Sequence, residues 1–205
     1  MKRKLNTTIE VFEKELSYIK DNVIREMTAF AIENMNSDFF VEAASSTGKY
    51  HPEYALGLGG LYRHTQAAVK IANDLLQLDM YKEKFSESLR DYIISALILH
   101  DSCKRGKDWN DKYTKFEHPL IVEDWLKEIF AEKLSIVDDD TNSKINEYIN
   151  AVSNLVKTHM GQWNKNKYSK IELPIPQLAP QKFVHLCDYL ASRKWLEVKI
   201  NQDDN

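Results

Sequence analysis

The segment YIISALILHDSCKRG, from Tyr92 to Gly106, is the starting point for interpreting this chain. Residues Tyr92–His100 are apolar on most of a helical surface, so we expect a central helix that other helices cover on nearly all sides. The apolar run ends in His100 and Asp101, and cationic residues follow. An ionised carboxylate at the end of a buried helix is unfavourable unless something compensates its lost hydration, and a bound cation would do so.

Hydrophobic periodicity along the rest of the chain predicts an all-α fold, because helical spacing is frequent and strand-like alternation is scarce. A capping-box pattern at Thr7 and Glu10 predicts a first helix that runs to about Met35. Glycines 57, 59 and 60 precede a helix that carries His64, and the acidic stretch VDDDTNS is expected to join two later helices. Besides the central helix, these later helices are expected at Pro119–Lys133, Ser143–His159 and Pro180–Glu197.

The length of 205 residues and the hydrophobic content of 43% favour one domain with one substantial core. We expect residues 1–38 to form an N-terminal helix packed on a domain at 39–200, with a frayed tail at 201–205. The predicted architecture is a single-domain helical bundle whose functional site lies between its central helices.

Composition and charge exclude several classes of protein. A net charge of −3 argues against a globally basic nucleic-acid binder. The only cysteines, Cys103 and Cys187, form no disulfide framework and no Cys-x-x-Cys pair, so we expect reduced thiols. No apolar run approaches the length of a membrane span, and the basic MKRK start precedes no apolar signal region. We therefore expect a cytoplasmic protein without a membrane partner, and a homo-oligomer is compatible with these observations.

Histidines are the strongest chemical signal in the chain. Neutral imidazoles and carboxylates without a thiolate cluster suit first-row ions such as Mn, Fe, Ni or Co better than structural zinc. A single helical histidine is more often a core residue than a ligand, but five with nearby aspartates indicate a metal site. Consecutive helical residues point about 100° apart, so His100 and Asp101 can reach one ion only from a helix end. The five are His64, His100, His118, His159 and His185, and the aspartates are Asp101 and Asp188.

The order of these residues resembles the HD-domain superfamily of metal-dependent phosphohydrolases. The resemblance covers about Phe39 to Leu196 and includes the segments GGLYRHT, HDSCK, EHP, THMG and HLCDYLASR. It is closest to the HD domain of bacterial 3′–5′ exoribonucleases, which share the GGL-x-x-HT element. That branch carries an OB-fold before the HD domain, whereas we expect one helix here, which argues against processive RNA degradation.

The resemblance implies an HD-type helical bundle, a ligand set and a reaction. It implies that His64, His100, Asp101 and Asp188 hold one divalent ion, and that His118 and His159 hold a second, with Asp101 bridging the two. The implied reaction is hydrolysis of a phosphoester in a nucleotide, cyclic nucleotide or short oligonucleotide by metal-activated hydroxide, with Asp101 and Lys104 as catalytic residues. The alternatives are a di-iron oxygenase with the same six ligands and a non-catalytic module that binds a nucleotide.

Lys104 follows Asp101 by three residues, so a continuing helix would place its ammonium near a substrate phosphate; the alternative is a surface lysine. Arg193 is a second candidate for a phosphate contact or a salt bridge. His185 precedes Asp188 by three residues and either supports the site or is a buried structural residue. His51 is expected to be structural or exposed.

Residues 161–180 form a long segment with three prolines and no clear period, and such loops are often functional. Trp163 favours order and is a candidate for binding substrate. The segment and the turn before it suit a phosphate-bearing small molecule or a short single-stranded nucleic acid; the alternative is a solvated lysine-rich loop. The lysines are Lys157, Lys165, Lys167 and Lys170.

Overall fold

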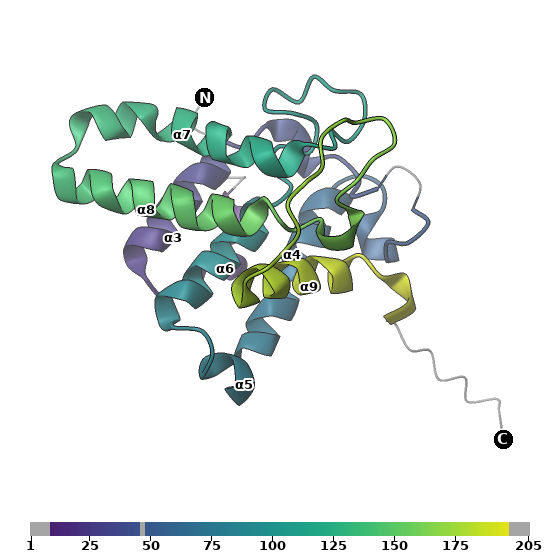
Figure 1. Cartoon of the computed structure of the whole chain (residues 1–205), viewed down its shortest axis with the longest axis horizontal. Coiled ribbons are helices and arrows are strands. Elements are labelled where there is room, and N and C mark those ends of the chain that lie inside the picture. Colours follow the sequence, from purple (N-terminus) through teal and green to yellow (C-terminus); the bar gives the residue numbers. More distant parts are fainter. Residues whose placement is uncertain (1–8, 46–47, 197–205) are drawn as a thin grey trace.

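Helix α6 (Glu87–Leu99) forms the centre of the molecule and corresponds to the predicted central helix. Its residues are buried without interruption from Ile93 to Leu99. It contacts α3, α4, α8 and α9, which surround it in the computed structural model (Figure 1). A helix that is apolar all round must be covered on all sides, and these four neighbours provide the cover.

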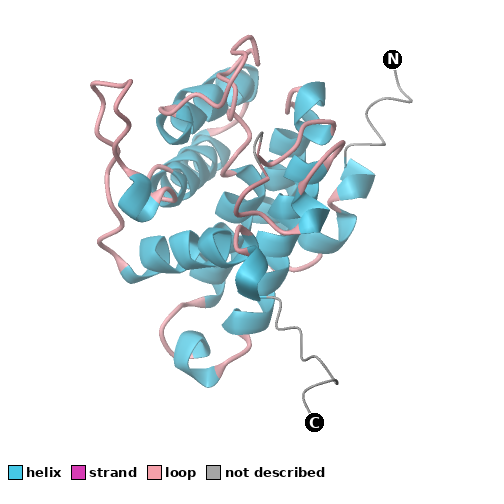
Figure 2. Cartoon of the chain, turned by 90° about the vertical axis from the view of Figure 1, so that its right-hand side faces the viewer, coloured by secondary structure: helices cyan, strands magenta, loops and turns pink. Residues whose placement is uncertain are grey.

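The structure describes residues 9–45 and 48–196, and within these ranges it contains helices and loops but no strand (Figure 2). The prediction of an all-α fold is therefore confirmed. No helix in the described ranges combines the length and apolar character that crossing a membrane would require. The remaining α-helices are α2 (Glu13–Leu16), α3 (Asn22–Glu33), α4 (Gly60–Leu76), α5 (Asp79–Lys82), α7 (His118–Ile136), α8 (Asp139–Val156) and α9 (Ala179–Ala191). Short 3₁₀ helices lie at Ser37–Phe40, Glu53–Ala55, Gly161–Trp163 and Lys194–Leu196.

The arrangement of the helices gathers several of their ends at one place. Helices α7 and α8 lie side by side as an antiparallel pair, and α8 also packs against α6 (Figure 1). Helix α4 packs against α6 and α9. His100 directly follows α6, His118 begins α7, and His159 lies shortly after the end of α8. The packing thus brings residues from distant parts of the sequence to one region.

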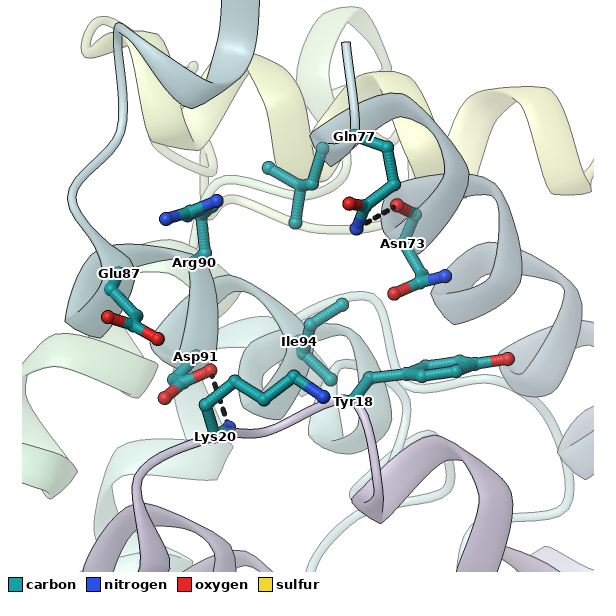
Figure 3. A pocket seen from close by; sticks show the side chains of 9 residues that line it. Tyr18, Lys20, Asn73, Gln77, Glu87, Arg90, Asp91 and Ile94 are labelled. Atoms are coloured by element: carbon teal, nitrogen blue, oxygen red, sulfur yellow. Dashed lines mark hydrogen bonds between the residues drawn. The ribbon is translucent and has the colours of Figure 1, made fainter. Parts of the chain in front are cut away.

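The prediction of one continuous first helix is wrong, because the helix is interrupted between α2 and α3. The backbone amides of Lys20 and Asp21 donate to the Asp91 carboxylate over 3.0 and 2.8 Å. The side chain of Asp21 in turn caps α3 by accepting from the amides of Val23 and Ile24. The segment between α2 and α3 lines a pocket together with the end of α4 and the start of α6. Figure 3 shows the hydrogen bond between Lys20 and Asp91 in this pocket. The predicted cap at Thr7 lies outside the described residues.

Other helix boundaries differ from the predictions for local reasons. Helix α8 begins at Asp139, inside the stretch VDDDTNS, because Asp138 caps it by accepting from the Thr141 amide over 2.8 Å. The expected acidic loop is therefore mostly the first turn of a helix. Helix α9 ends at Ala191 instead of running to Glu197, and the short helix α5 was not predicted. The predicted tail at 201–205 lies outside the described residues.

The glycine-rich turn before α4 has a conformational role. Gly59 has a φ of 72°, in the left-handed region that favours glycine. A Cβ atom on Gly60 would lie 2.2 Å from the carbonyl oxygen of Ala55, so only glycine allows the 3₁₀ turn at Glu53–Ala55 to lie this close to α4. These contacts fix the start of the helix that carries His64.

Both cysteines lie in the core, which leads to a prediction about their reactivity. Burial raises the pKa of the Cys103 thiol to about 12 and raises the pKa of Cys187 as well. Because the thiolate is the reactive form, we expect native protein at pH 8 to resist a thiol reagent such as Ellman's reagent. Denatured protein is expected to release two equivalents of the coloured thiolate. Fast labelling of native protein would show that one of these thiols is accessible.

Candidate metal centre

The structure brings all six predicted ligand residues together. His64 lies on α4, Asp188 lies on α9, and His118 is the first residue of α7. His100 and Asp101 follow the last residue of α6, which is the helix-end position that the sequence predicted. Five of the six are buried, and the side chain of Asp188 is 19% exposed. The remaining ligand residue, His159, follows α8 and is one of the five buried residues.

The ligand atoms form two groups that share Asp101. In the first, one atom each from His64, His100 and Asp101 lie within 4.8 Å of one another, and in the second the same holds for Asp101, His118 and His159. Asp101 Oδ2 lies 3.4 Å from His100 Nε2, whereas Asp101 Oδ1 lies 3.1 Å from His118 Nε2. The two oxygens of one carboxylate therefore face different groups.

Asp188 belongs with the first group. Its Oδ1 atom lies 3.0 Å from His64 Nε2 and 3.6 Å from His100 Nε2. The first group thus contains two imidazoles and two carboxylates, and the second contains two imidazoles and the shared Asp101. Neither group includes a cysteine among the described residues. This donor set suits one or two divalent first-row ions.

Backbone contacts orient three of the imidazoles. The Nδ1 atoms of His100, His118 and His159 lie 2.7, 2.7 and 2.8 Å from the carbonyl oxygens of the residues three positions earlier. A carbonyl oxygen only accepts, so each Nδ1 carries the proton and each neutral ring presents the lone pair of Nε2 to the centre. Metal-binding histidines are commonly oriented by such contacts.

The Nε2 atoms of three imidazoles and the carboxylate of Asp101 therefore face one another, and all of them are hydrogen-bond acceptors. His118 Nε2 lies 3.2 Å from His159 Nε2, and both atoms face Asp101 Oδ1, His159 Nε2 at 4.0 Å. His100 Nε2 is buried without a hydrogen-bond partner among the described residues. Lone pairs at these distances repel one another unless a proton or a cation lies between them. The residues thus fit a divalent cation by the chemistry of their donor atoms.

The electrostatics of the site keep its carboxylates ionised. Burial raises the pKa of Asp101, but the ammonium of Lys104 and the neighbouring His100 outweigh burial and hold this pKa well below its usual value. Burial likewise opposes ionisation of Asp188, yet its hydrogen bond with His64 and the neighbouring His100 lower its pKa. Burial lowers the pKa of His159 to about 3, helped by neighbouring His118. At neutral pH both carboxylates are anionic and His159 is neutral, as metal ligands must be.

Lys104 lies beside the shared ligand, and a turn places it there instead of a continuing helix. The helix ends at Leu99, and the chain turns so that the Lys104 amide donates to the Asp101 carbonyl over 3.0 Å. The Nζ atom of Lys104 lies 2.6 Å from Asp101 Oδ2, and the side chain is 15% exposed. A phosphate contact for this lysine stays a prediction.

The long segment after α8 is a loop, as predicted. It begins with the 3₁₀ helix Gly161–Trp163 and reaches α9 without further helix. Lys165 pairs with Glu172 at 3.2 Å, and Lys167 Nζ lies 4.6 Å from the centroid of the Tyr168 ring. Two of the loop's three lysine candidates, Lys165 and Lys167, thus have partners within the loop. The side chain of Trp163 is 42% exposed, and Arg193 stacks on it.

Two further histidines adjoin the ligands. His185 Nδ1 lies 2.7 Å from the carbonyl oxygen of His159, so it supports the turn that carries that ligand. A Cβ atom on Gly161 would lie 2.2 Å from the His185 ring, which explains the glycine. The ring of His51 lies 5.4 Å from that of His64, and its buried Nδ1 has no hydrogen-bond partner among the described residues. Burial lowers the pKa of His51 to about 4.

No pattern in the sequence pointed to His51, because a loop residue reaches the site only through the fold. For His185 the spacing of three residues before Asp188 was such a signal. The described residues therefore form a buried group of imidazoles and carboxylates that can hold a metal ion, flanked by Lys104 and His51. Comparisons of the chain with protein-family models, with curated proteins and with solved structures found no match.

Proposed function

We propose that this chain is a metal-dependent phosphohydrolase that cleaves a phosphoester of a nucleotide, a cyclic nucleotide or a short oligonucleotide. The observation that carries the proposal is the pair of ligand groups that share the buried carboxylate of Asp101. Two divalent ions at such a site would activate the attacking water and neutralise charge on the phosphoryl group. The ordered resemblance to HD-domain phosphohydrolases supports the same reaction.

In this proposal the residues of the site have different roles. Asp101 offers one oxygen to each group, while His100, His118 and His159 present Nε2 lone pairs in orientations that backbone carbonyls maintain. Lys104, whose side chain is 15% exposed, supplies a cation beside Asp101, and its ammonium can donate to a phosphate oxygen. Cys187, which precedes Asp188 in the sequence, is buried with a raised pKa and does not act as a nucleophile.

Metal binding is the first part of the test. Protein stripped with a chelator and dialysed against Mn²⁺, Fe²⁺, Co²⁺ or Ni²⁺ is expected to retain about one to two ions per chain, measured by elemental analysis. Since the ligands repel one another without a cation, bound metal is also expected to raise Tm. Protein that binds none of these ions and shows no change in Tm would contradict the proposed site.

Phosphate release is the second part. Metal-loaded protein is incubated with nucleoside mono- and triphosphates, cyclic nucleotides, cyclic dinucleotides and short RNA, and the products are separated by chromatography. We expect hydrolysis of at least one class, its loss with chelator and its return with added metal. Iron-loaded protein that consumes O₂ without hydrolysing any phosphoester would support a di-iron oxygenase. Nucleotide binding without turnover would support a non-catalytic module.

A further inference from the structure

Three aromatic rings gather around one guanidinium group beside the candidate metal centre. The Cζ atom of Arg193 lies 4.6 Å from the ring centroid of Trp163, 4.5 Å from that of Tyr189 and 5.7 Å from that of Tyr50. The rings of Trp163 and Tyr189 are stacked, with centroids 5.7 Å apart and planes inclined by 13°. We call Tyr50, Trp163, Tyr189 and Arg193 the aromatic shelf.

Each ring of the aromatic shelf is connected to a residue of the metal centre, either along the backbone or through a neighbouring side chain. Tyr189 follows the ligand Asp188 directly, on the same helix. Tyr50 precedes His51, whose ring lies 5.4 Å from that of His64. The backbone amide of Lys194 donates to the carbonyl oxygen of Tyr50 over 2.9 Å, which joins this loop to the end of α9.

Trp163 is tied to the centre through a histidine. Its ring centroid lies 6.0 Å from that of His185, and His185 Nδ1 lies 2.7 Å from the carbonyl oxygen of the ligand His159. The aromatic shelf is therefore connected to both ligand groups, to His64 and Asp188 of the first and to His159 of the second. These links hold the shelf in a fixed position relative to the metal centre.

Two rings of the shelf remain accessible although they are already ordered. Trp163 is 42% exposed and Tyr50 is 46% exposed. Rings that served only to fasten the end of α9 would be more stable if they were buried, because each exposed aromatic surface forgoes hydrophobic stabilisation. The ring of Trp163 is accessible, and its contacts with Tyr189 and Arg193 keep it in place. Such a ring suits a nucleobase, since every base has a π-face that stacks on aromatic side chains.

We propose that the aromatic shelf binds the base of the substrate, so that the enzyme acts on nucleotides in preference to sugar phosphates. The inference rests on the proposed function for the position of the phosphate, but the stacking of a base does not depend on hydrolysis. The exposed ring of Trp163 provides the principal stacking surface. Arg193 holds Trp163 and Tyr189 in place and adds a cation beside the bound base.

The first experiment uses adenosine, which has a base but no phosphate, so binding is measured without turnover. Quenching of tryptophan fluorescence on titration with adenosine should reveal binding, whereas ribose should cause none. Trp163→Ala removes the stacking surface and leaves only the emission of the three other tryptophans, so its affinity is measured by calorimetry and is expected to fall about tenfold. Trp163→Phe should retain most of the affinity. The matched control is Tyr168→Ala, which removes an aromatic side chain that is 85% exposed in the same loop but outside the shelf.

The second experiment compares adenosine 5′-monophosphate with ribose 5-phosphate as substrates of metal-loaded protein. Wild-type protein should prefer the nucleotide in kcat/KM by about tenfold or more, and Trp163→Ala should remove most of this preference by raising KM for the nucleotide alone. Tyr50→Ala, in a different loop, provides a second variant in case Trp163→Ala does not fold.

The two experiments separate the two proposals. Adenosine binding that depends on Trp163 in a protein without hydrolytic activity would support the aromatic shelf and contradict the proposed function. Hydrolysis with equal preference for the two substrates, unchanged in both variants, would support the function and overturn the shelf. Adenosine binding of equal strength in wild-type protein and both variants would likewise overturn it.

Discussion

Asp101→Asn is expected to abolish metal binding and activity together, because this residue belongs to both ligand groups. The substitution removes a charge that both ions would share and replaces one oxygen by an amide nitrogen that donates hydrogen bonds. That nitrogen can donate to His118 Nε2, which lies 3.1 Å from Asp101 Oδ1, and so occupy a lone pair that a metal would need. Loss of a residue that only supports a ligand costs about 10- to 100-fold in metal affinity, so loss of this ligand should cost at least about 100-fold.

The measurement is metal content by elemental analysis together with Tm before and after metal is added. Metal-free Asp101→Asn protein should fold, because the new amide relieves repulsion among acceptors, but its Tm should no longer rise with metal. The matched control is Asp111→Asn in the same loop, whose side chain is 50% exposed and pairs with Lys115 at 3.6 Å. The control should bind metal like the wild type. Asp101→Asn protein that keeps both metal and turnover would show that Asp101 is not a shared ligand.

The central helix and the fold class could be predicted because their causes are local. A segment such as Ile93–Leu99, which is apolar apart from Ser95, fits only a position that is covered on all sides, whichever helices provide the cover. The break between α2 and α3 could not be predicted in this way. It depends on Asp91, whose carboxylate accepts from the Asp21 amide 70 residues away, while the hydrophobic spacing continues through the break.

The candidate site was predictable in its members but not in its geometry. Residue type, order and the helix-end position of His100 and Asp101 identified the six side chains that the fold brings together. Nothing in the sequence indicated that backbone carbonyls would set the direction of three imidazoles, since each contact needs the chain to turn after a helix or at its start. His51 was missed for a related reason: its contact with His64 arises where a loop returns to α4.

Lys104 lies beside Asp101 by a different route from the one that the sequence suggested. The sequence-based interpretation considered a helix that continues past Asp101, which would place residues three apart on one face. The helix ends at Leu99, and a turn instead brings the ammonium to 2.6 Å from Asp101 Oδ2. Turns and helices both place residues three positions apart near each other, which is why the spacing alone could not distinguish them.

Lys104→Ala is expected to separate metal binding from catalysis. The six ligand residues remain, so metal content should persist, whereas kcat should fall by roughly 10² to 10³, the usual effect of losing one electrostatic donor to a transition state. KM should change little if the ammonium acts mainly on charge that develops during the reaction. The measurements are kcat, KM and metal content on the same preparation of metal-loaded protein.

Two variants test this separation. Lys107→Ala is the matched control, because it removes a more exposed lysine of the same loop that pairs with Glu128 rather than with a ligand, and its kcat should equal that of the wild type. Lys104→Arg keeps the positive charge and should recover part of the lost activity. Since the charge of Lys104 helps to hold the Asp101 pKa low, a fall in metal content with Lys104→Ala would assign the lysine to ligand ionisation instead of the phosphate. Full activity in Lys104→Ala would remove the lysine from the reaction altogether and leave the bound ions as the source of charge stabilisation.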